Sequence, residues 1–176
     1  MRFPHFAIAA VVLSLAAPAV PAQDFGYRGW GPRVGVSEDP DQVFGGIHLD
    51  MGEFARNVRF QPNAELGIGD DLLLLAINLE AAYLFPVHQS WMPYAGGGLG
   101  LNYINYDSDI GGGDDTDLGV NILGGVQRVR SNAPDFFLEM KIGLDDSPDF
   151  KFAVGWTFGK PTRSSHAGGK PPQKTP

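Results

Sequence analysis

The chain has 176 residues, of which 43% are hydrophobic and 19% are charged, with no cysteine and a formal net charge of −7. Its length is sufficient for one domain. The composition excludes a disordered acidic chain, and the lack of cysteine excludes disulfide scaffolds and thiolate sites. The acidic balance argues against nucleic acid as a partner, since phosphate binding depends on lysine and arginine.

Residues 1–22 have the pattern of a secretory signal peptide. Arg2 provides a positive start, residues 6–17 are almost wholly apolar, and Ala19–Ala22 is a small-residue cleavage site. The apolar stretch is shorter than the roughly 20 residues that a helical span needs, which argues against a retained anchor. We therefore expect Sec-type secretion and cleavage, followed by a short N-terminal segment at residues 23–29.

From Trp30 to Phe158 the sequence alternates apolar and polar residues, and clusters of Asp, Gly, Asn and Pro interrupt the alternation. A period of two residues predicts strands, and these clusters predict turns. The predicted strands are residues 30–37, 43–52, 58–69, 72–85, 91–106, 118–130, 136–144 and 150–158. About 10 residues per strand is the length that a tilted membrane-crossing strand needs.

The two faces of these strands differ in kind. One face is apolar, as in the last strand at Phe150, Phe152, Val154, Trp156 and Phe158. The other mixes glycine, alanine and amides with isolated charges, which fits a narrow lumen better than a solvated surface. The pattern predicts an all-β, eight-stranded antiparallel up-and-down transmembrane β-barrel. The alternative is a soluble lipocalin-like barrel that binds a small ligand and has the apolar faces inside.

The charges on the polar face are balanced. They are Arg33, Arg59, Lys141 and Lys151 against Asp50, Glu65, Glu80 and Glu139, with His48 beside them. Eight strands leave an interior that side chains can fill, and unpaired charges there are costly. We predict a salt-bridged lumen charge network, with a small or gated pore for small solutes as the alternative. A two-residue turn at Asp70–Asp71 predicts that Gln61 lies opposite Glu80.

The connections also differ in charge. The first, third, fifth and seventh contain 13 of the 20 acidic residues and no base. In an up-and-down barrel these four connections lie at the same end, so the pattern predicts one acidic rim. Aromatic residues are predicted to form two girdles, one of which includes Phe44 and Tyr103 near the acidic rim.

The domain at residues 30–158 resembles the small eight-stranded outer-membrane β-barrels of the OmpA, OmpX and opacity-protein type. The resemblance rests on the signal, the eight alternating strands, the stretch from Trp91 to Tyr103 and the aromatic final strand. It implies a Gram-negative outer-membrane location with both termini in the periplasm, and outer-membrane lipids and lipopolysaccharide as partners. The final strand is similar to the signal that the outer-membrane assembly machinery recognises.

The family includes porin-like, adhesive and envelope-stabilising proteins, so the resemblance does not fix one activity. We expect a non-catalytic protein with a structural or surface-exposed role, in envelope integrity or as a surface antigen. Two features depart from the family pattern. The outer connections are short for an adhesin, and residues 159–176 form a basic tail rich in proline and glycine. We expect a disordered tail that is a candidate contact for peptidoglycan.

Few residues suggest catalysis. His88 and Ser90 form an H-x-S pair similar to that of the outer-membrane lipid A deacylase. They are predicted on the periplasmic side, away from lipid A in the outer leaflet, and no Glu follows on the next strand. His48 beside Asp50 has no evident nucleophile as a partner, so we expect no enzyme and no cofactor.

One loop is a candidate for weak binding of calcium or magnesium. Asp107, Asp109, Asp114 and Asp115 cluster around glycines, but the spacing and the later Glu of an EF-hand are missing. We therefore expect loose binding of a divalent cation at most.

Overall fold

The computed structural model describes residues 24–69, 72–87, 90–106, 114–128, 134–145, 148–160 and 162. The expected signal peptide lies outside these ranges. The described residues form eight strands: β1 (Asp24–Glu38), β2 (Gln42–Ala55), β3 (Val58–Gly69), β4 (Leu72–Leu84), β5 (Trp91–Tyr106), β6 (Asp114–Arg128), β7 (Asp135–Asp145) and β8 (Phe150–Gly159). Within the same ranges, no helix has the length and apolarity that a membrane-spanning helix requires.

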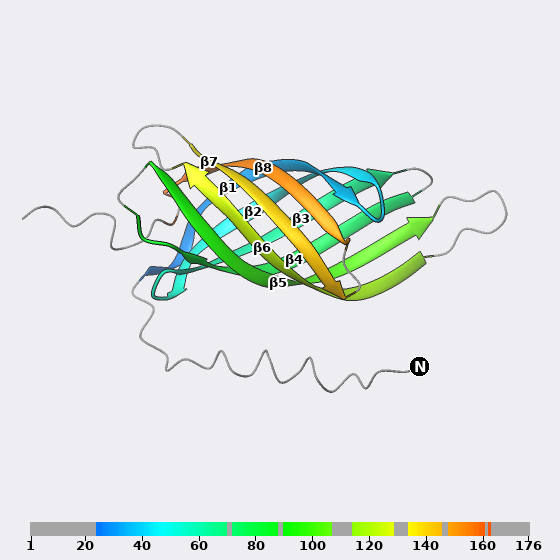
Figure 1. Ribbon diagram of the computed structural model, residues 1–176, viewed down its shortest axis with the longest axis horizontal. Coiled ribbons are helices and arrows are strands. Elements are labelled where there is room, and N and C mark those ends of the chain that lie inside the picture. The colour runs from blue at the N-terminus through cyan, green and yellow to red at the C-terminus, as the bar shows by residue number, and fades with distance from the viewer. Residues whose placement is uncertain are drawn as a thin grey trace, which may run out of the picture.

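The strands form one closed barrel in sequence order (Figure 1). Each strand pairs antiparallel with its neighbours in sequence, and β1 closes the barrel against β8, for example at Trp30 and Phe158. Closure leaves no free sheet edge. The predicted eight-stranded antiparallel up-and-down barrel is thus confirmed.

Several boundaries differ from the predicted ones. Strand β1 begins at Asp24, so the segment expected before the barrel belongs to its first strand, where Phe25 pairs with Gly52. A register shift between Phe25 and Gly29 interrupts the alternation there, which hid this part of the strand. Strand β6 begins at Asp114, within the region expected to be a loop, because Asp114 pairs with Asn105. Strands β5 and β6 therefore extend beyond the others (Figure 1).

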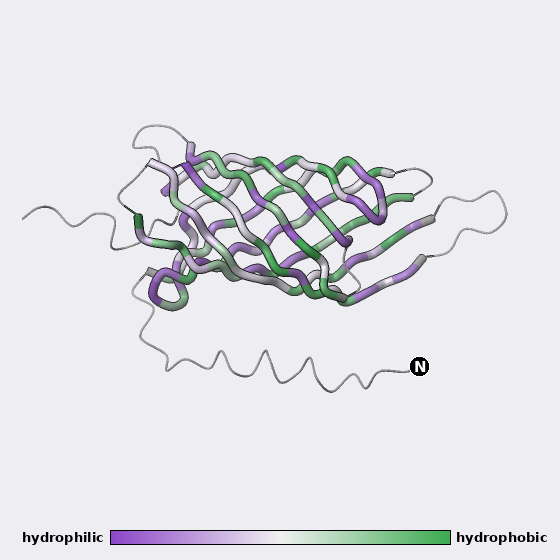
Figure 2. The backbone as a smooth tube through the Cα atoms, in the orientation of Figure 1, coloured by the Kyte–Doolittle hydropathy of each residue, from purple (hydrophilic) through white to green (hydrophobic). Residues whose placement is uncertain are grey.

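Hydropathy alternates along most strands (Figure 2), and burial alternates with it. In β8, Lys151, Ala153 and Thr157 are buried, whereas Trp156 and Phe158 are exposed. The buried side chains point into the lumen, because consecutive residues of a strand face opposite sides of the sheet. Most of the large apolar residues thus lie on the outside. A lipocalin-like barrel has the reverse arrangement, and that alternative is wrong.

Two tight turns set the register of β3. Ala55 pairs with Val58 across a two-residue turn in which Asn57 has φ of 60°, a conformation that asparagine tolerates better than most residues. Gly69 pairs with Leu72 across the next turn. The predicted pairing of Gln61 with Glu80 is confirmed.

The two ends of the barrel carry opposite exposed charge. We call the end with the first, third, fifth and seventh connections the loop end, and the other the terminal end. Exposed or half-exposed acids of the described residues lie at the loop end: Glu38, Asp39, Asp41, Asp115, Asp117 and Asp149. At the terminal end the exposed or half-exposed charges are basic: Arg28, Arg56, Arg128 and Lys160. Glu53 and Asp135, also at that end, are buried.

Outward-facing aromatic residues encircle the terminal end. We call them the aromatic belt: Phe25, Tyr27, Trp30, Phe54, Phe60, Tyr83, Phe85, Trp91, Phe136, Trp156 and Phe158. Neighbours within it are in ring contact, with Trp156 5.5 Å from Phe136 and 5.9 Å between Trp30 and Phe158. The predicted girdle at the loop end is less complete. Phe44 is 2% exposed and points into the lumen, which corrects its predicted position, whereas Tyr103 faces outward.

Candidate functional site

A network of three bases and three acids fills the middle of the lumen. We call it the central network: Arg33, Glu65, Glu80, Glu139, Lys141 and Lys151. Arg33 on β1 lies 3.0 Å from Glu65 and 2.5 Å from Glu139, measured between side-chain nitrogen and carboxylate oxygen. All six side chains are almost fully removed from solvent.

The two lysines join strands that lie three or four positions apart around the barrel. Lys141 on β7 is paired with Glu80 on β4 and lies 3.3 Å from Glu65 on β3. Lys151 on β8 donates a 2.7 Å hydrogen bond to the other oxygen of Glu65. In a closed ring of eight strands, β3 faces β7 and β4 faces β8. The network therefore crosses the lumen.

Three inward aromatic rings support two cations of the central network and one cation outside it. Arg33 lies over Phe137, Arg59 over Tyr94 and Lys151 over Phe44, at 5.7, 4.9 and 4.6 Å from the ring centres. A cation over an aromatic face is favourable, and more so away from water. These rings therefore hold the cations in position from the side.

Each of the three rings also lies over a glycine on the neighbouring strand. The directly paired positions are Phe137 with Gly155, Tyr94 with Gly125, and Phe44 with Gly35. A β-carbon on Gly35 would lie 2.6 Å from the Phe44 ring, and one on Gly125 would collide with Tyr94. Glycine is therefore required at these positions, because a narrow lumen has no other room for the rings.

Amide side chains lie around the central network. Asn78 donates a 2.8 Å hydrogen bond to Asn63 on the opposite strand of the β3–β4 pair. A cavity of about 10 Å³ is lined by Asn78, Asn102, Asn121, Lys141, Pro148 and Lys151. Such a volume holds about one water molecule. This part of the lumen is polar but almost filled.

A second polar group, separate from the central network, occupies the terminal half of the lumen. The Nε2 atom of His48 lies 3.0 Å from the hydroxyl of Thr157, and Arg59 donates a 2.6 Å hydrogen bond to Gln127. Asp50 accepts hydrogen bonds from Gly52 and from Thr162.

All nine residues of the predicted charge network face the lumen and are buried. Six of them form the central network. The described ion pairs do not include the other three, which are Asp50, Arg59 and His48. The sequence pattern gives the face of each residue but not its height in the barrel, which depends on strand stagger. Sequence reasoning also missed Tyr94, Gln127 and Thr162 as parts of the lumen.

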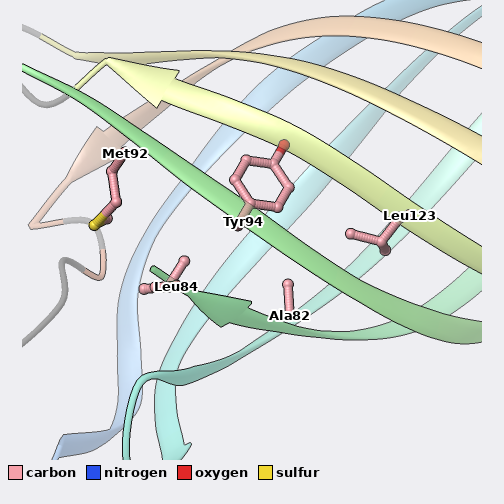
Figure 3. Packing of buried hydrophobic residues seen from close by; sticks show 5 residues of the cluster. All are labelled: Ala82, Leu84, Met92, Tyr94 and Leu123. Atoms are coloured by element: carbon pink, nitrogen blue, oxygen red, sulfur yellow. The ribbon is translucent and has the colours of Figure 1, made fainter. Parts of the chain in front are cut away.

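An apolar cluster fills one side of the lumen beside these polar groups (Figure 3). Its members are Ala82 and Leu84 on β4, Met92 and Tyr94 on β5, and Leu123 on β6. Tyr94 connects it to the polar groups, because its hydroxyl donates a 3.0 Å hydrogen bond to Glu139. The lumen is therefore packed with both apolar and charged side chains.

The other predicted sites are placed as follows. His88 lies outside the described residues, and Ser90 is exposed just before β5. Asp107 and Asp109 also lie outside them, whereas Asp114 and Asp115 belong to β6. Among the described residues no group of three or more His, Asp or Glu side chains is arranged to hold a metal ion. The aromatic side chains of β8 line its outer face: Phe150, Phe152, Trp156 and Phe158, with Val154 between them.

Comparison with known proteins finds structural neighbours only. No family model and no curated protein matches the chain. The crystal structure of Neisserial surface protein A is similar with a TM-score of 0.62 at 16% identity, covering 76% of this chain and 96% of that one. The N-terminal β-barrel domain of Pseudomonas aeruginosa OprF is similar with a TM-score of 0.60 at 16% identity, covering 77% of this chain and 100% of that one. The chain therefore has the fold of the small eight-stranded outer-membrane β-barrels.

Proposed function

We propose that this chain is a non-catalytic integral protein of the bacterial outer membrane, with a closed lumen and a structural or surface-exposed role in the envelope. One observation carries the proposal: apolar side chains cover the outside of the barrel while ion pairs fill its inside. Side chains such as Ile77 and Leu79 at the middle of β4 are about half exposed, at 51% each. Soluble monomers rarely expose apolar patches above a few hundred Å².

The aromatic belt supports a membrane boundary at the terminal end. Tryptophan and tyrosine accumulate where lipid tails meet headgroups, because their rings have both apolar and polar parts. Trp30, Trp91 and Trp156 are all in the belt and between 40 and 48% exposed. Arg128, next to the belt, lies over the Trp91 ring at 5.8 Å, so a positive charge sits at the same boundary.

The charge difference between the ends supports an orientation. We place the acidic loop end outside the cell and the basic terminal end, with both chain termini, in the periplasm, after Sec-type export. The acids at the loop end would then face the divalent cations that bridge lipopolysaccharide phosphates. The name of the neisserial neighbour, a surface protein, is compatible with this exposure.

The filled lumen argues against the pore alternative. Arg33, Glu65 and Glu139 are between 0 and 1% exposed, so solvent reaches them from neither mouth. The same packing argues against an enzyme. His48 is fully buried, and its described hydrogen-bond partner is Thr157, so it has no room for a substrate.

The proposal includes two partners. The outward aromatic face of β8 suits recognition by the outer-membrane assembly machinery, and the basic tail beyond β8 remains a candidate for peptidoglycan contact. Neither partner is required for the proposed lipid-facing role.

The test is fractionation of cells that express the full chain. We expect the protein in the outer-membrane fraction, resistant to extraction by urea, and migrating differently in SDS gels before and after boiling. A soluble periplasmic protein serves as the control for leakage between fractions. Release by urea without detergent would contradict the proposal.

A further inference from the structure

The chain turns back into the barrel after β8. Lys160 donates a 2.7 Å backbone hydrogen bond to the carbonyl of Arg28, and Gly159 before it has φ of 113°, which favours glycine. Thr162, two residues further on, is only 6% exposed. It lies in the region expected to be a disordered tail, so the start of that tail is instead fixed in the barrel.

Thr162 is held from two sides. Its backbone nitrogen donates to Asp50 at 2.6 Å, and its hydroxyl donates to the other carboxylate oxygen at 2.5 Å. Its carbonyl accepts a 3.1 Å hydrogen bond from Gln127. Thus the backbone donor, the backbone acceptor and the hydroxyl of this one residue are all bonded to inward-facing side chains.

The two partners lie on opposite walls. Asp50 belongs to β2 and Gln127 to β6, and these strands are four apart in either direction around the closed ring of eight. A residue bonded to both therefore crosses the terminal mouth. Behind Gln127, the Arg59 guanidinium is bonded to the same amide and lies over Tyr94, so the far attachment point is itself fixed.

The backbone around Asp50 positions its carboxylate for the contact with Thr162. Strand β2 has a register shift against β3 between His48 and Glu53, and Gly52 there has φ of 75°. Irregularities of this kind redirect side chains. Asp50 is fully buried, and its hydrogen bonds come from Gly52 and Thr162. Without Thr162, this carboxylate would lose two of those hydrogen bonds, which are costly to lose for a buried charge.

We propose that Thr162 is an intrachain stopper: this residue closes the terminal mouth of the barrel, in addition to the central network that closes its middle. Displacing Thr162 opens the terminal half of the lumen to water, down to the central network. The loop half stays closed, because the described hydrogen bonds of Thr162 go to Asp50 and Gln127 and not to the side chains that form the ion pairs of Arg33 and Lys141. This inference goes beyond the proposed function, which needs only the central network.

The chain lacks cysteine, so single introduced thiols can report on access. Thr157→Cys places a thiol on the inner face of the terminal half, where residue 157 is 4% exposed. Ser37→Cys places one on the inner face near the loop end, where residue 37 is 8% exposed. Both substitutions conserve side-chain size. Each is combined with Thr162→Asp, which sets a second carboxylate against Asp50, and with Thr162→Ser, which keeps the hydroxyl.

The measurement is the rate of labelling by a small water-soluble methanethiosulfonate reagent in the full-length, membrane-reconstituted protein. We expect Thr162→Asp to accelerate labelling at position 157 by about tenfold or more, because labelling follows the open population. We expect Thr162→Ser to leave the rate unchanged, and position 37 to be unaffected in both backgrounds.

Equal labelling at position 157 in the Thr162→Asp and parent backgrounds would overturn the stopper. Equal acceleration at positions 37 and 157 would also overturn it, because that result indicates general loosening. If Thr162→Asp does not fold, Asp50→Asn tests the same contact from the other side with a nearly isosteric change. In that case the proposal requires Asp50→Asn to accelerate labelling at position 157 and to leave labelling at position 37 unchanged. Loss of the stopper leaves the membrane location untouched, so failure here is distinguishable from failure of the proposed function.

Discussion

At the scale of single residues, the lumen repeats one arrangement three times: a glycine on one strand, an aromatic ring over it from the next, and a cation on the ring. Phe137 connects Gly155 to Arg33 in this way. The glycine supplies space and the ring supplies apolar contact and a negative face for the cation. Each member thus depends on the other two.

Replacing Gly155 by alanine tests this dependence. The added β-carbon would lie 2.6 Å from a Phe137 ring carbon and 2.8 Å from the Pro32 carbonyl oxygen, so the ring must move. We expect Gly155→Ala to lower the free energy of unfolding by about 1–3 kcal/mol, measured by denaturant unfolding in lipid vesicles. Gly45→Ala is the matched control, since no atom lies within 4 Å of its β-carbon position, and equal losses in both variants would contradict the arrangement.

Removing the guanidinium of Arg33 tests the central network. Arg33→Met leaves Glu139 buried without its closest cation and removes one of the three cations around Glu65. We expect a loss of about 3–5 kcal/mol in the free energy of unfolding, because the carboxylates remain out of water. Adding Glu139→Gln to Arg33→Met should restore part of that loss, since the two residues are coupled. A double variant that shows simple additivity would argue against a shared network.

At the scale of strands, each element separates two environments by its alternation. The inner face of β4 includes Asn78 and Glu80, and its outer face includes Ile77 and Leu79. Strand β3 has the same division, and two-residue turns on both sides keep the faces in register. The wall of the barrel therefore separates an apolar outer face from a polar interior across the thickness of a single strand.

A lysine on the outer face of β4 distinguishes lipid from water as the surroundings of the barrel. Ile77 lies at the middle of the strand and Leu73 near the loop end, and both are exposed. We expect Ile77→Lys to cost about 2–4 kcal/mol and Leu73→Lys about 0–1 kcal/mol, because the penalty depends on membrane depth. Unfolding of both variants in the same vesicles gives the comparison. A neutral effect of Ile77→Lys would show that water surrounds the barrel.

The strands were the most predictable part of the molecule, because the side of the sheet that a side chain faces follows from the local alternation of residues. A period of two residues assigned Arg33 and Lys141 to the lumen, and the turn after Gly69 predicted the pairing of Gln61 with Glu80. The prediction for Phe44 was wrong because an aromatic side chain near a strand end is typical of an outer girdle. In the structure its ring points inward and lies over Gly35. Thr162 could not be predicted, since its contacts with Asp50 and Gln127 are more than 30 residues away in the chain.

At the scale of the whole molecule, the barrel has two closures and two different ends. The central network closes the middle, and Thr162 lies across the terminal mouth. The loop end is acidic outside, whereas the terminal end combines the aromatic belt with exposed bases such as Arg56 and Lys160. In the proposed membrane setting, this difference between the ends gives the barrel one preferred orientation in the bilayer.

The closed lumen predicts that the barrel does not conduct ions. We expect the full-length protein in planar bilayers to give no discrete conductance steps, because ion pairs of Arg33, Lys141 and Lys151 cross the lumen. An open barrel of larger size, measured in parallel, controls for insertion and detection. Reproducible steps from the purified protein would support the pore alternative instead.

The most direct test of the account is tryptophan quenching by brominated lipids. The chain has three tryptophans, Trp30, Trp91 and Trp156, and all three face outward in the aromatic belt. In reconstituted vesicles we predict strong quenching by lipids brominated near the headgroup and weaker quenching by lipids brominated near the bilayer centre. Emission that is unaffected by either lipid, or quenched most from the centre, would contradict a barrel whose apolar outer face spans the membrane with the belt at one boundary.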